Sequence, residues 1–324
     1  MKLLLAWYRR GHRDLPWRRT QDPYGIWVSE IMLQQTRAQA VIPYYQRFLD
    51  RFPTVEMLAA AEEQDVLALW AGLGYYSRAR NLRRAAQQVV AMGGFPRDYE
   101  AIRALPGIGD YTAAAIASIA FQLPHAVVDG NVLRVVARAE NDAADIASQR
   151  TRERFRAIAR QWMGRGQPGA FNQALMELGA TVCLPANPLC RECPIAGDCR
   201  ALREGTVAQL PVKLRKKEPV AIAAVLLLVR DGDRVLLRQK EAGARRMAGF
   251  WELPAPDDLP GARAGKSFGE FRHTITHHHY TFTVRAASVR TTGPEFRWFA
   301  AAQLEGIPFS TTARKALKLA RFLL

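Results

Sequence analysis

The sequence lacks long hydrophobic runs, is sparing with cysteine and carries a minority of acidic residues. No apolar stretch reaches the roughly 18–20 residues that cross a bilayer, so we expect no membrane partner. The apolar stretch before Arg9 is too short for a signal peptide and lacks a small-residue cleavage site, and we expect it to form the first helix. With only four cysteines, paired disulfides are not expected, which favours a reducing, cytoplasmic location.

What the chain does have is an excess of basic charge. It contains 46 Lys and Arg against 30 Asp and Glu, which gives a formal net charge of +16. A field of that size attracts polyanions, with nucleic acid as the first candidate and an anionic membrane surface as the second. The 324 residues, 49% of them hydrophobic, predict a globular protein of two domains.

Two regions of different pattern follow one another along the chain. Residues 1–204 predict a helical domain, because apolar residues recur at helical spacing and the segment 113–121 is rich in alanine. Residues 205–218 contain Pro211 and the basic run 213–217 and predict a linker. We favour a solvated tether with incidental DNA contact over an arm that lies on phosphates.

From residue 219 the pattern becomes that of strands. An apolar, β-branched run is followed by Asp231-Gly232, a dipeptide typical of hairpin turns. The expected strands, followed by a closing helix, cover 220–229, 235–237, 280–286 and 312–323. We therefore expect a small α+β domain over residues 219–324.

All four cysteines lie in one tract with the spacing C-x6-C-x2-C-x5-C: Cys183, Cys190, Cys193 and Cys199. Prolines between them favour turns, which lets the sulfurs converge. Four thiolates this close suit tetrahedral zinc or a [4Fe–4S] cluster. The spacing resembles the iron–sulfur loop of the endonuclease III superfamily of DNA glycosylases. That resemblance favours a [4Fe–4S] cluster with a structural role, which would press a basic edge onto DNA.

The string LPGIG at residues 105–109 precedes the alanine-rich segment. Gly107 and Gly109 permit a tight turn with exposed backbone N–H groups, and the next helix adds the positive end of its dipole. Together these features predict a phosphate site that reads no base sequence. The string resembles the helix–hairpin–helix of the same superfamily.

Asp129 follows an apolar stretch and begins the next expected helix. A helix N-cap is as good an interpretation of it as a functional carboxylate. By resemblance it matches the catalytic aspartate of the superfamily, and a cap would hold such a carboxylate still. Bifunctional members carry a lysine at the position of Tyr111, where the amine forms a Schiff base. Tyrosine cannot do so, and we expect base removal without strand cleavage.

Glu30 lies in the string WVSEIMLQQTR at residues 27–37. A surface glutamate is the ordinary interpretation, but the neighbouring Ile26, Trp27 and Leu33 should surround it and raise its pKa by desolvation. This string, with GLGYYSRARNL at residues 72–82, strongly resembles the adenine DNA glycosylases (the MutY family). The resemblance is close over residues 5–200 and loose in the C-terminal domain.

That resemblance implies a mechanism on double-stranded DNA with an adenine:8-oxoguanine or adenine:guanine mispair. The adenine is flipped out of the duplex, and protonated Glu30 gives a proton to its N7. Asp129, oriented by Asn131, would face the oxocarbenium-like sugar as nucleophile or electrostatic partner, as in a glycosidase. Glu30 would then activate water. A monomer suits an enzyme that wraps a duplex.

The same resemblance implies further contacts. The adenine pocket would be lined by Arg13, Leu15, Trp17 and Glu177, although core packing is nearly as good an interpretation of Leu15 and Trp17. The wedges into the base stack would be Gln35 and Tyr75. The orphaned 8-oxoguanine would be touched by Thr36 and Leu73.

The string GFWELP at residues 249–254 resembles a Nudix-like fold, but the glutamate-rich box of Nudix hydrolases does not follow it. Pyrophosphate hydrolysis is therefore not expected. In the family this domain helps to recognise 8-oxoguanine through a Phe-Ser-His hairpin, and the matching positions here are Ile275, Thr276 and His277. Two of the three differ, which leaves lesion reading with altered strength. His277 and His279 would share a strand face, but incidental histidines are favoured over a metal site.

Two other classes of function remain open. One is a bifunctional pyrimidine-lesion glycosylase and AP lyase, against which Tyr111 and the second domain argue. The other is a non-enzymatic, DNA-bound iron–sulfur electron carrier, which Glu30 and Asp129 make redundant. The carrier predicts no effect of Glu30→Gln, whereas the adenine glycosylase predicts near-complete loss of base removal.

Overall fold

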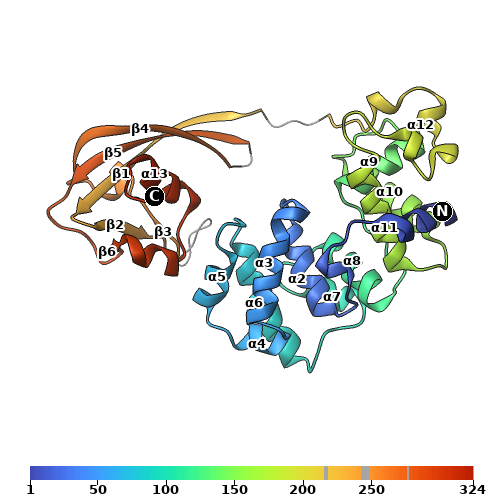
Figure 1. The fold of residues 1–324 in the computed structure, drawn as a ribbon, viewed down its shortest axis with the longest axis horizontal. Helices are drawn as coiled ribbons and strands as arrows, with labels where there is room; N and C mark the ends of the chain where they lie inside the picture. The colour runs from blue at the N-terminus through green and yellow to red at the C-terminus, as the bar shows by residue number, and fades with distance from the viewer. Residues whose placement is uncertain (215–217, 242–248, 276, 324) are drawn as a thin grey trace. The chain divides into compact units, whose positions relative to one another are not determined.

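The computed structural model describes residues 1–214, 218–241, 249–275 and 277–323 (Figure 1). The chain separates into two compact units. The first comprises Met1–Ala61 and Asn81–Lys216, and the second comprises Glu62–Arg80 and Lys217–Leu324. No helix in the described ranges combines the length and the apolar character that a bilayer crossing requires.

The first unit is built from helices, as the sequence predicts. They are α1 (Lys2–Gly11), α2 (Pro23–Leu33), α3 (Ala38–Arg51), α4 (Val55–Ala60), α7 (Tyr99–Ala104), α8 (Asp110–Phe121), α9 (Gly130–Ala139), α10 (Gln149–Met163), α11 (Pro168–Thr181) and the short α12 (Arg200–Arg203). Helix α6 (Ser77–Ala91) begins in the second unit and continues in the first. Short 3-10 helices cover Pro16–Arg18, Cys190–Glu192, Ala196–Asp198 and Val207–Gln209.

Helices α2 and α8 form the centre of this unit and pack against each other. Both are apolar on nearly every side, as buried helices are. Alanine supplies much of the buried surface of α8, which lets its neighbours approach closely. Helix α11 packs against both α8 and α9. This arrangement brings together the ends of α2, α8, α9 and α11, where the candidate catalytic residues lie.

The expected tether does not begin at residue 205. The buried Arg138 donates from Nε to the carbonyl oxygens of Val207 (3.1 Å) and Leu210 (2.9 Å). The backbone N–H of Ile146 donates to the carbonyl oxygen of Val212 at 3.0 Å. The prediction of a solvated tether is therefore wrong for this part of the segment, because buried arginine and carbonyl groups satisfy each other there. The basic residues 215–217 lie outside the described residues.

The second unit contains a mixed sheet. Its elements are α5 (Glu63–Trp70), β1 (Val220–Asp231), β2 (Arg234–Gln239), β3 (Trp251–Glu252), β4 (Arg263–Ile275), β5 (His278–Ser288), β6 (Phe296–Ala300) and α13 (Thr311–Leu319). Strand order is β3-β2-β1-β5-β4, with β6 paired to β2. β1 runs parallel to β5 and antiparallel to β2, and β4 is antiparallel to β5. The Asp231-Gly232 turn is confirmed, since Asp231 pairs with Arg234.

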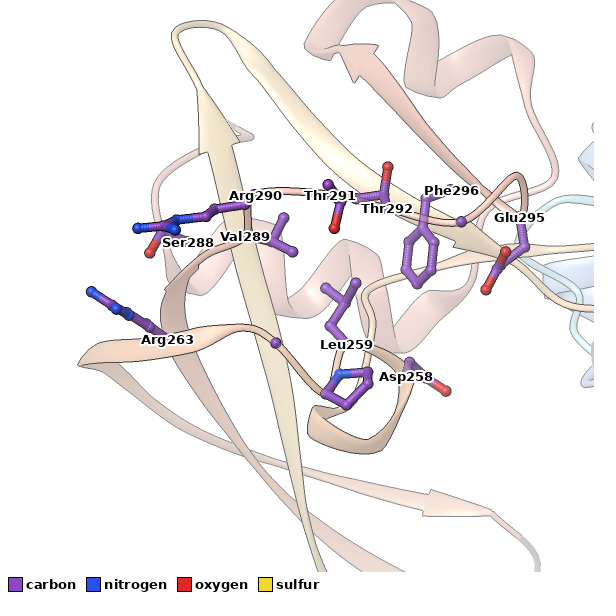
Figure 2. Close-up of a pocket in the computed structure, with 13 residues that line it drawn as sticks. Asp258, Leu259, Arg263, Ser288, Val289, Arg290, Thr291, Thr292, Glu295 and Phe296 are labelled. Carbon is purple, nitrogen blue, oxygen red and sulfur yellow. The ribbon is translucent and has the colours of Figure 1, made fainter.

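The sheet has a core on each face. Helix α13 covers one face, where Ala313 and Leu317 pack with Leu228 and Val284. The other face is covered by the segment that follows GFWELP, which contributes Leu259 and the short 3-10 helix Pro256–Asp258. A hollow of about 660 Å³ opens there. Figure 2 shows two arginines of its lining on one side and two carboxylates on the other. The segment that follows GFWELP is thus a short loop with a single 3-10 turn, Pro256–Asp258.

Candidate active site and DNA-binding surface

Glu30 lies near the C-terminal end of α2 and is 5% exposed. Within the described residues, no hydrogen-bond partner meets its Oε2 atom. Burial raises the pKa of Glu30 from 4.5 to about 7; a hydrogen bond with Tyr111 opposes the rise and the nearby charge of Asp129 adds to it. The carboxyl group is therefore poised to hold and release a proton near neutral pH, as the apolar neighbours in the sequence predict.

Tyr111 is the second residue of α8, and its hydroxyl donates to the Met176 sulfur at 3.5 Å. Burial, together with the charges of Glu30 and Asp129, raises the pKa of Tyr111 well above its ordinary value. The phenol stays neutral, and its hydroxyl group is also hydrogen-bonded to the Glu30 carboxyl group. The side chain carries no amine that could attack a sugar.

Asp129 is the N-cap of α9, which confirms the structural interpretation of this residue. Its Oδ1 accepts from the backbone N–H of Val132 at 2.7 Å, and its Oδ2 accepts from Asn131 Nδ2 at 2.9 Å. Burial raises the pKa of Asp129, and these two hydrogen bonds oppose the rise by favouring the carboxylate. The cap thus fixes a half-buried carboxylate whose charge also acts on Glu30.

Asn131 is itself held in place. Its Oδ1 accepts from Arg134 at 2.8 Å, and Arg134 also donates to the carbonyl oxygens of Gly179 and Cys183, both at 2.7 Å. A Cβ atom at Gly179 would lie 2.6 Å from the Asn131 Cβ, so only glycine lets α11 approach α9 here. Both the packing and the hydrogen bonds orient the amide that contacts Asp129.

Arg13 and Glu177, 164 positions apart, are in direct contact. Glu177 accepts from Arg13 Nε at 2.9 Å and from Arg18 at 2.7 Å. Although burial favours a raised pKa, these two arginines lower the pKa of Glu177 to about 2. Arg18 was missed in the sequence, where nothing connects it to a partner so distant. The cluster places a permanent carboxylate between two guanidinium groups.

Leu15 and Trp17 are both buried, and Trp17 packs edge-on against Tyr45 at 5.5 Å between ring centroids. They precede Arg18 in the chain and anchor the short 3-10 helix that contains it. Core packing, one of the two interpretations of these residues, is therefore what the structure describes.

The four cysteines all lie in the loop that follows α11, half-buried and free of disulfides. Burial, with smaller contributions from the three other thiols, raises the pKa of Cys193 to about 11. Arg138 donates to the Cys183 sulfur at 3.3 Å. Among the described residues, no group of three or more His, Cys, Asp or Glu side chains converges closely enough to hold a metal ion.

The turn between α7 and α8 requires glycine at position 107. Gly107 has a φ of +78°, and a Cβ there would lie 2.7 Å from the Asn81 Cβ. Gly109 is the N-cap of α8, is exposed, and has open space where a Cβ would stand. Backbone N–H groups at the start of a 12-residue helix are accordingly open to an anion.

The two residues expected to act as wedges share an unusual backbone. Gln35 and Tyr75 have φ values of +58° and +49°, a backbone region that residues other than glycine rarely adopt. Gln35 is exposed and Thr36 half-buried in the first unit, whereas the buried Leu73 and the exposed Tyr75 belong to the second. Strained positions of this kind concentrate at functional sites.

The hairpin between β4 and β5 is the expected lesion-reading segment. Ile275 ends β4 and pairs with His278 at the start of β5. His277 is half-buried, and its ring lies 4.0 Å from that of His278. His279 is exposed. Thr276 lies outside the described residues.

Comparison with known families agrees with this geometry. Residues 28–161 match the HhH-GPD superfamily of base excision DNA repair proteins, and residues 224–319 match the NUDIX domain. A solved thermostable thymine-DNA glycosylase is 30% identical with a TM-score of 0.58, and the match covers 63% of this chain and 94% of that one. The fold and the site define a helix–hairpin–helix DNA glycosylase.

Curated relatives narrow the assignment. The adenine DNA glycosylase of Homo sapiens is 34% identical over 398 residues, which cover 98% of this chain and 73% of that protein. The enzyme of the same description from Arabidopsis thaliana is 40% identical over 294 residues, covering 78% of this chain and 46% of its own length. The chain belongs to the adenine DNA glycosylases, which confirms the resemblance seen in the sequence. The chain spans about half the length of the relative from Arabidopsis thaliana.

Proposed function

We propose that this protein is a monofunctional glycosylase that removes adenine mispaired with 8-oxoguanine or guanine in double-stranded DNA. The observation that carries the proposal is the buried carboxyl group of Glu30, with a pKa of about 7, beside the capped carboxylate of Asp129. Two carboxyl groups in environments that separate their roles are what hydrolysis of a glycosidic bond requires.

In this proposal Glu30 protonates N7 of the flipped adenine, which makes the base a leaving group. Asp129, held by Asn131 and by the start of α9, stabilises the positive charge that develops on the sugar. Glu30, now ionised, accepts a proton from the attacking water. Tyr111 donates a hydrogen bond and forms no covalent intermediate, so the DNA backbone stays intact.

The ion-paired cluster of Arg13, Arg18 and Glu177 supplies the polar side of the proposed adenine pocket. Its charges persist across the physiological range because the pKa of Glu177 is about 2. A fixed array of donors and acceptors can orient a purine edge without a change of protonation. Leu15 and Trp17 support this array by packing in the core.

The four cysteines fit a [4Fe–4S] cluster. The set is entirely thiol, it lies in one short loop, and the guanidinium group of Arg138 donates to one of its sulfurs, as donors commonly do to cluster thiolates. A tetrahedral zinc ion would need its four sulfurs about 3.8 Å apart, given Zn–S bonds of about 2.3 Å. Among the described residues no group of side chains converges that closely. When bound, the cluster would cross-link the loop. Arg138 and Arg134 tie that loop to α9.

Three surface features would engage the duplex. The Gly107–Gly109 turn would hold a phosphate, Gln35 and Tyr75 would enter the base stack, and Thr36 with Leu73 would contact the orphaned 8-oxoguanine. His277, with Ile275 and Thr276, would contribute to lesion reading from the second unit. We propose that the protein binds the duplex as a monomer.

The test is a single-turnover assay on duplex DNA with adenine opposite 8-oxoguanine, with and without hot alkali. Glu30→Gln is compared with Glu153→Gln, which changes an exposed glutamate on α10. We expect strand breaks only after alkali, no product from Glu30→Gln and normal product from Glu153→Gln. Strand breaks without alkali would favour the AP lyase. Normal activity of Glu30→Gln would show that Glu30 is not the acid.

A further inference from the structure

The loop from Gly72 to Tyr75 joins α5 to α6 and is built from strained backbone. The φ values of Gly72, Gly74 and Tyr75 are +106°, +70° and +49°. Only the two glycines adopt this region freely, whereas the Cβ of tyrosine makes it unfavourable. Tyr75 is nonetheless 45% exposed, so its own burial does not hold it there. Contacts from other, buried side chains must therefore hold the loop in this conformation.

Arg78 lies beneath this loop. It is 8% exposed, and one terminal nitrogen of its guanidinium group donates to the carbonyl oxygens of Leu73 and Gly74, both at 3.1 Å. The guanidinium carbon also lies 5.5 Å from the ring centroid of Tyr75 and 5.4 Å from that of Trp70. Trp70 Nε1 donates to the Gly74 carbonyl at 3.2 Å.

We infer that Arg78 is the positioning residue that holds Leu73 and Tyr75 in the conformation that enters the DNA duplex. The inference rests on the proposed function, in which these two residues meet the base stack and the lesion. Arg78 acts through the loop and does not touch the reacting atoms. It donates to the carbonyl oxygens of two consecutive peptides, Leu73–Gly74 and Gly74–Tyr75, and lies against the ring of Tyr75.

The chemistry of this contact requires arginine. A planar guanidinium group can donate in its plane to two carbonyl groups while its face lies against an aromatic ring. Lysine ends in a compact charge on a shorter side chain without a planar face, so it cannot reproduce this geometry. Burial lowers the pKa of Arg78 to about 10, which still leaves the group charged at neutral pH. We therefore expect Arg78→Lys to keep the charge and lose the support.

The experiment measures base unstacking without chemistry. All variants carry Glu30→Gln, and the duplex holds 2-aminopurine beside an adenine opposite 8-oxoguanine. Arg78→Met and Arg78→Lys are made alone and with Tyr75→Ala. Arg230→Met is the matched control, because Arg230 also donates to a carbonyl oxygen (Gly232, 3.3 Å) and lies over a ring (Phe322, 5.0 Å) but is exposed.

We expect both Arg78 variants to reduce the fluorescence gain at saturating protein several-fold, much as Tyr75→Ala does. In the Tyr75→Ala background the same variants should change it little, because the residue they support is gone. Arg230→Met should leave it unchanged in either background. An unchanged signal for Arg78→Met, or equal losses with and without Tyr75, would overturn the inference. Thermal unfolding of each variant separates a collapse of the fold from a misplaced loop, and Arg78→Lys decides if Arg78→Met does not fold.

The outcome is separable from that of the proposed function. Adenine excision is scored with the Glu30-containing protein, and its absence there would reject the glycosylase proposal alone. The unstacking signal needs only binding, so it tests Arg78 whichever base is finally removed.

Discussion

At the scale of single residues, Glu30 controls the expected dependence on pH. Its pKa is raised from 4.5 to about 7 by burial, so the protonated acid predominates below neutrality. We predict a single-turnover rate constant that falls about tenfold per pH unit above pH 7. The raised pKa of Asp129, which acts as the carboxylate, adds a decline on the acid side. Rates measured from about pH 5 to 9 check this.

The contribution of Glu30 to the free energy of unfolding, like the reaction rate, should also decrease as the pH rises. Because the folded state prefers the protonated form, the contribution is complete below its ordinary pKa of 4.5 and is lost as the pH rises through about 7. Glu30→Gln should abolish that loss while abolishing catalysis. A wild-type rate that continued to rise above pH 7 would contradict the role of Glu30 as an acid.

Residues recognisable from local strings were found in the sequence, and residues defined by distant partners were not. Glu30 has apolar neighbours in its own helix, and Asp129 begins one, so both could be located before the fold was known. Arg18 acquires its meaning from Glu177, 159 positions away, and no local pattern reveals that pairing. The left-handed backbone of Gln35 was equally hidden, since glutamine rarely adopts it.

At the scale of an element, the turn between α7 and α8 contains two glycines, Gly107 and Gly109, that have different roles. We predict that Gly107→Ala loses about 1–2 kcal/mol of stability, because alanine resists a positive φ and its Cβ would meet Asn81. Gly109→Ala should keep nearly full stability, since its Cβ would meet open space. Both should weaken DNA binding, the second by placing a methyl group where a phosphate would approach.

Urea unfolding and binding to an undamaged duplex measure the two effects. Gly11→Ala is the control, because Gly11 has no positive φ and open space around it. It should change neither quantity appreciably. Full affinity in Gly109→Ala would show that the turn does not approach the phosphates.

Regular elements were predictable to the extent that their periodicity is strong. The helices of the first unit and the strands β1, β2 and β5 follow clear apolar patterns. Strand β4 was missed because its sequence, RAGKSFGEFRHTI, mixes glycine and charge into a half-exposed strand. Residues 205–212 were misjudged because their hydrogen bonds to Arg138 and Ile146 are non-local.

At the scale of the whole molecule, one grouping of segments depends on contacts rather than on composition. Residues Glu62–Arg80 cluster with the C-terminal sheet, and within that unit Tyr76 packs on Phe250 at 3.9 Å between ring centroids. Such a contact joins segments far apart in the chain and leaves no signature in either. The domain boundaries drawn from composition, 1–204, 205–218 and 219–324, stay a prediction, except that residues 207–212 are hydrogen-bonded to the first unit.

The net charge of +16 predicts that the affinity for DNA depends strongly on salt concentration. If the turn and the basic residues together neutralise about five phosphates, the affinity for a duplex should fall roughly 500-fold between about 50 and 200 mM salt, because each contact releases a counterion. The excision rate at saturating protein should stay constant, since Glu30 and Asp129 are shielded from the ions. Titration of a labelled duplex over this range measures the slope. An affinity that barely changed with salt would mean that the positive charge serves another purpose than binding the DNA backbone.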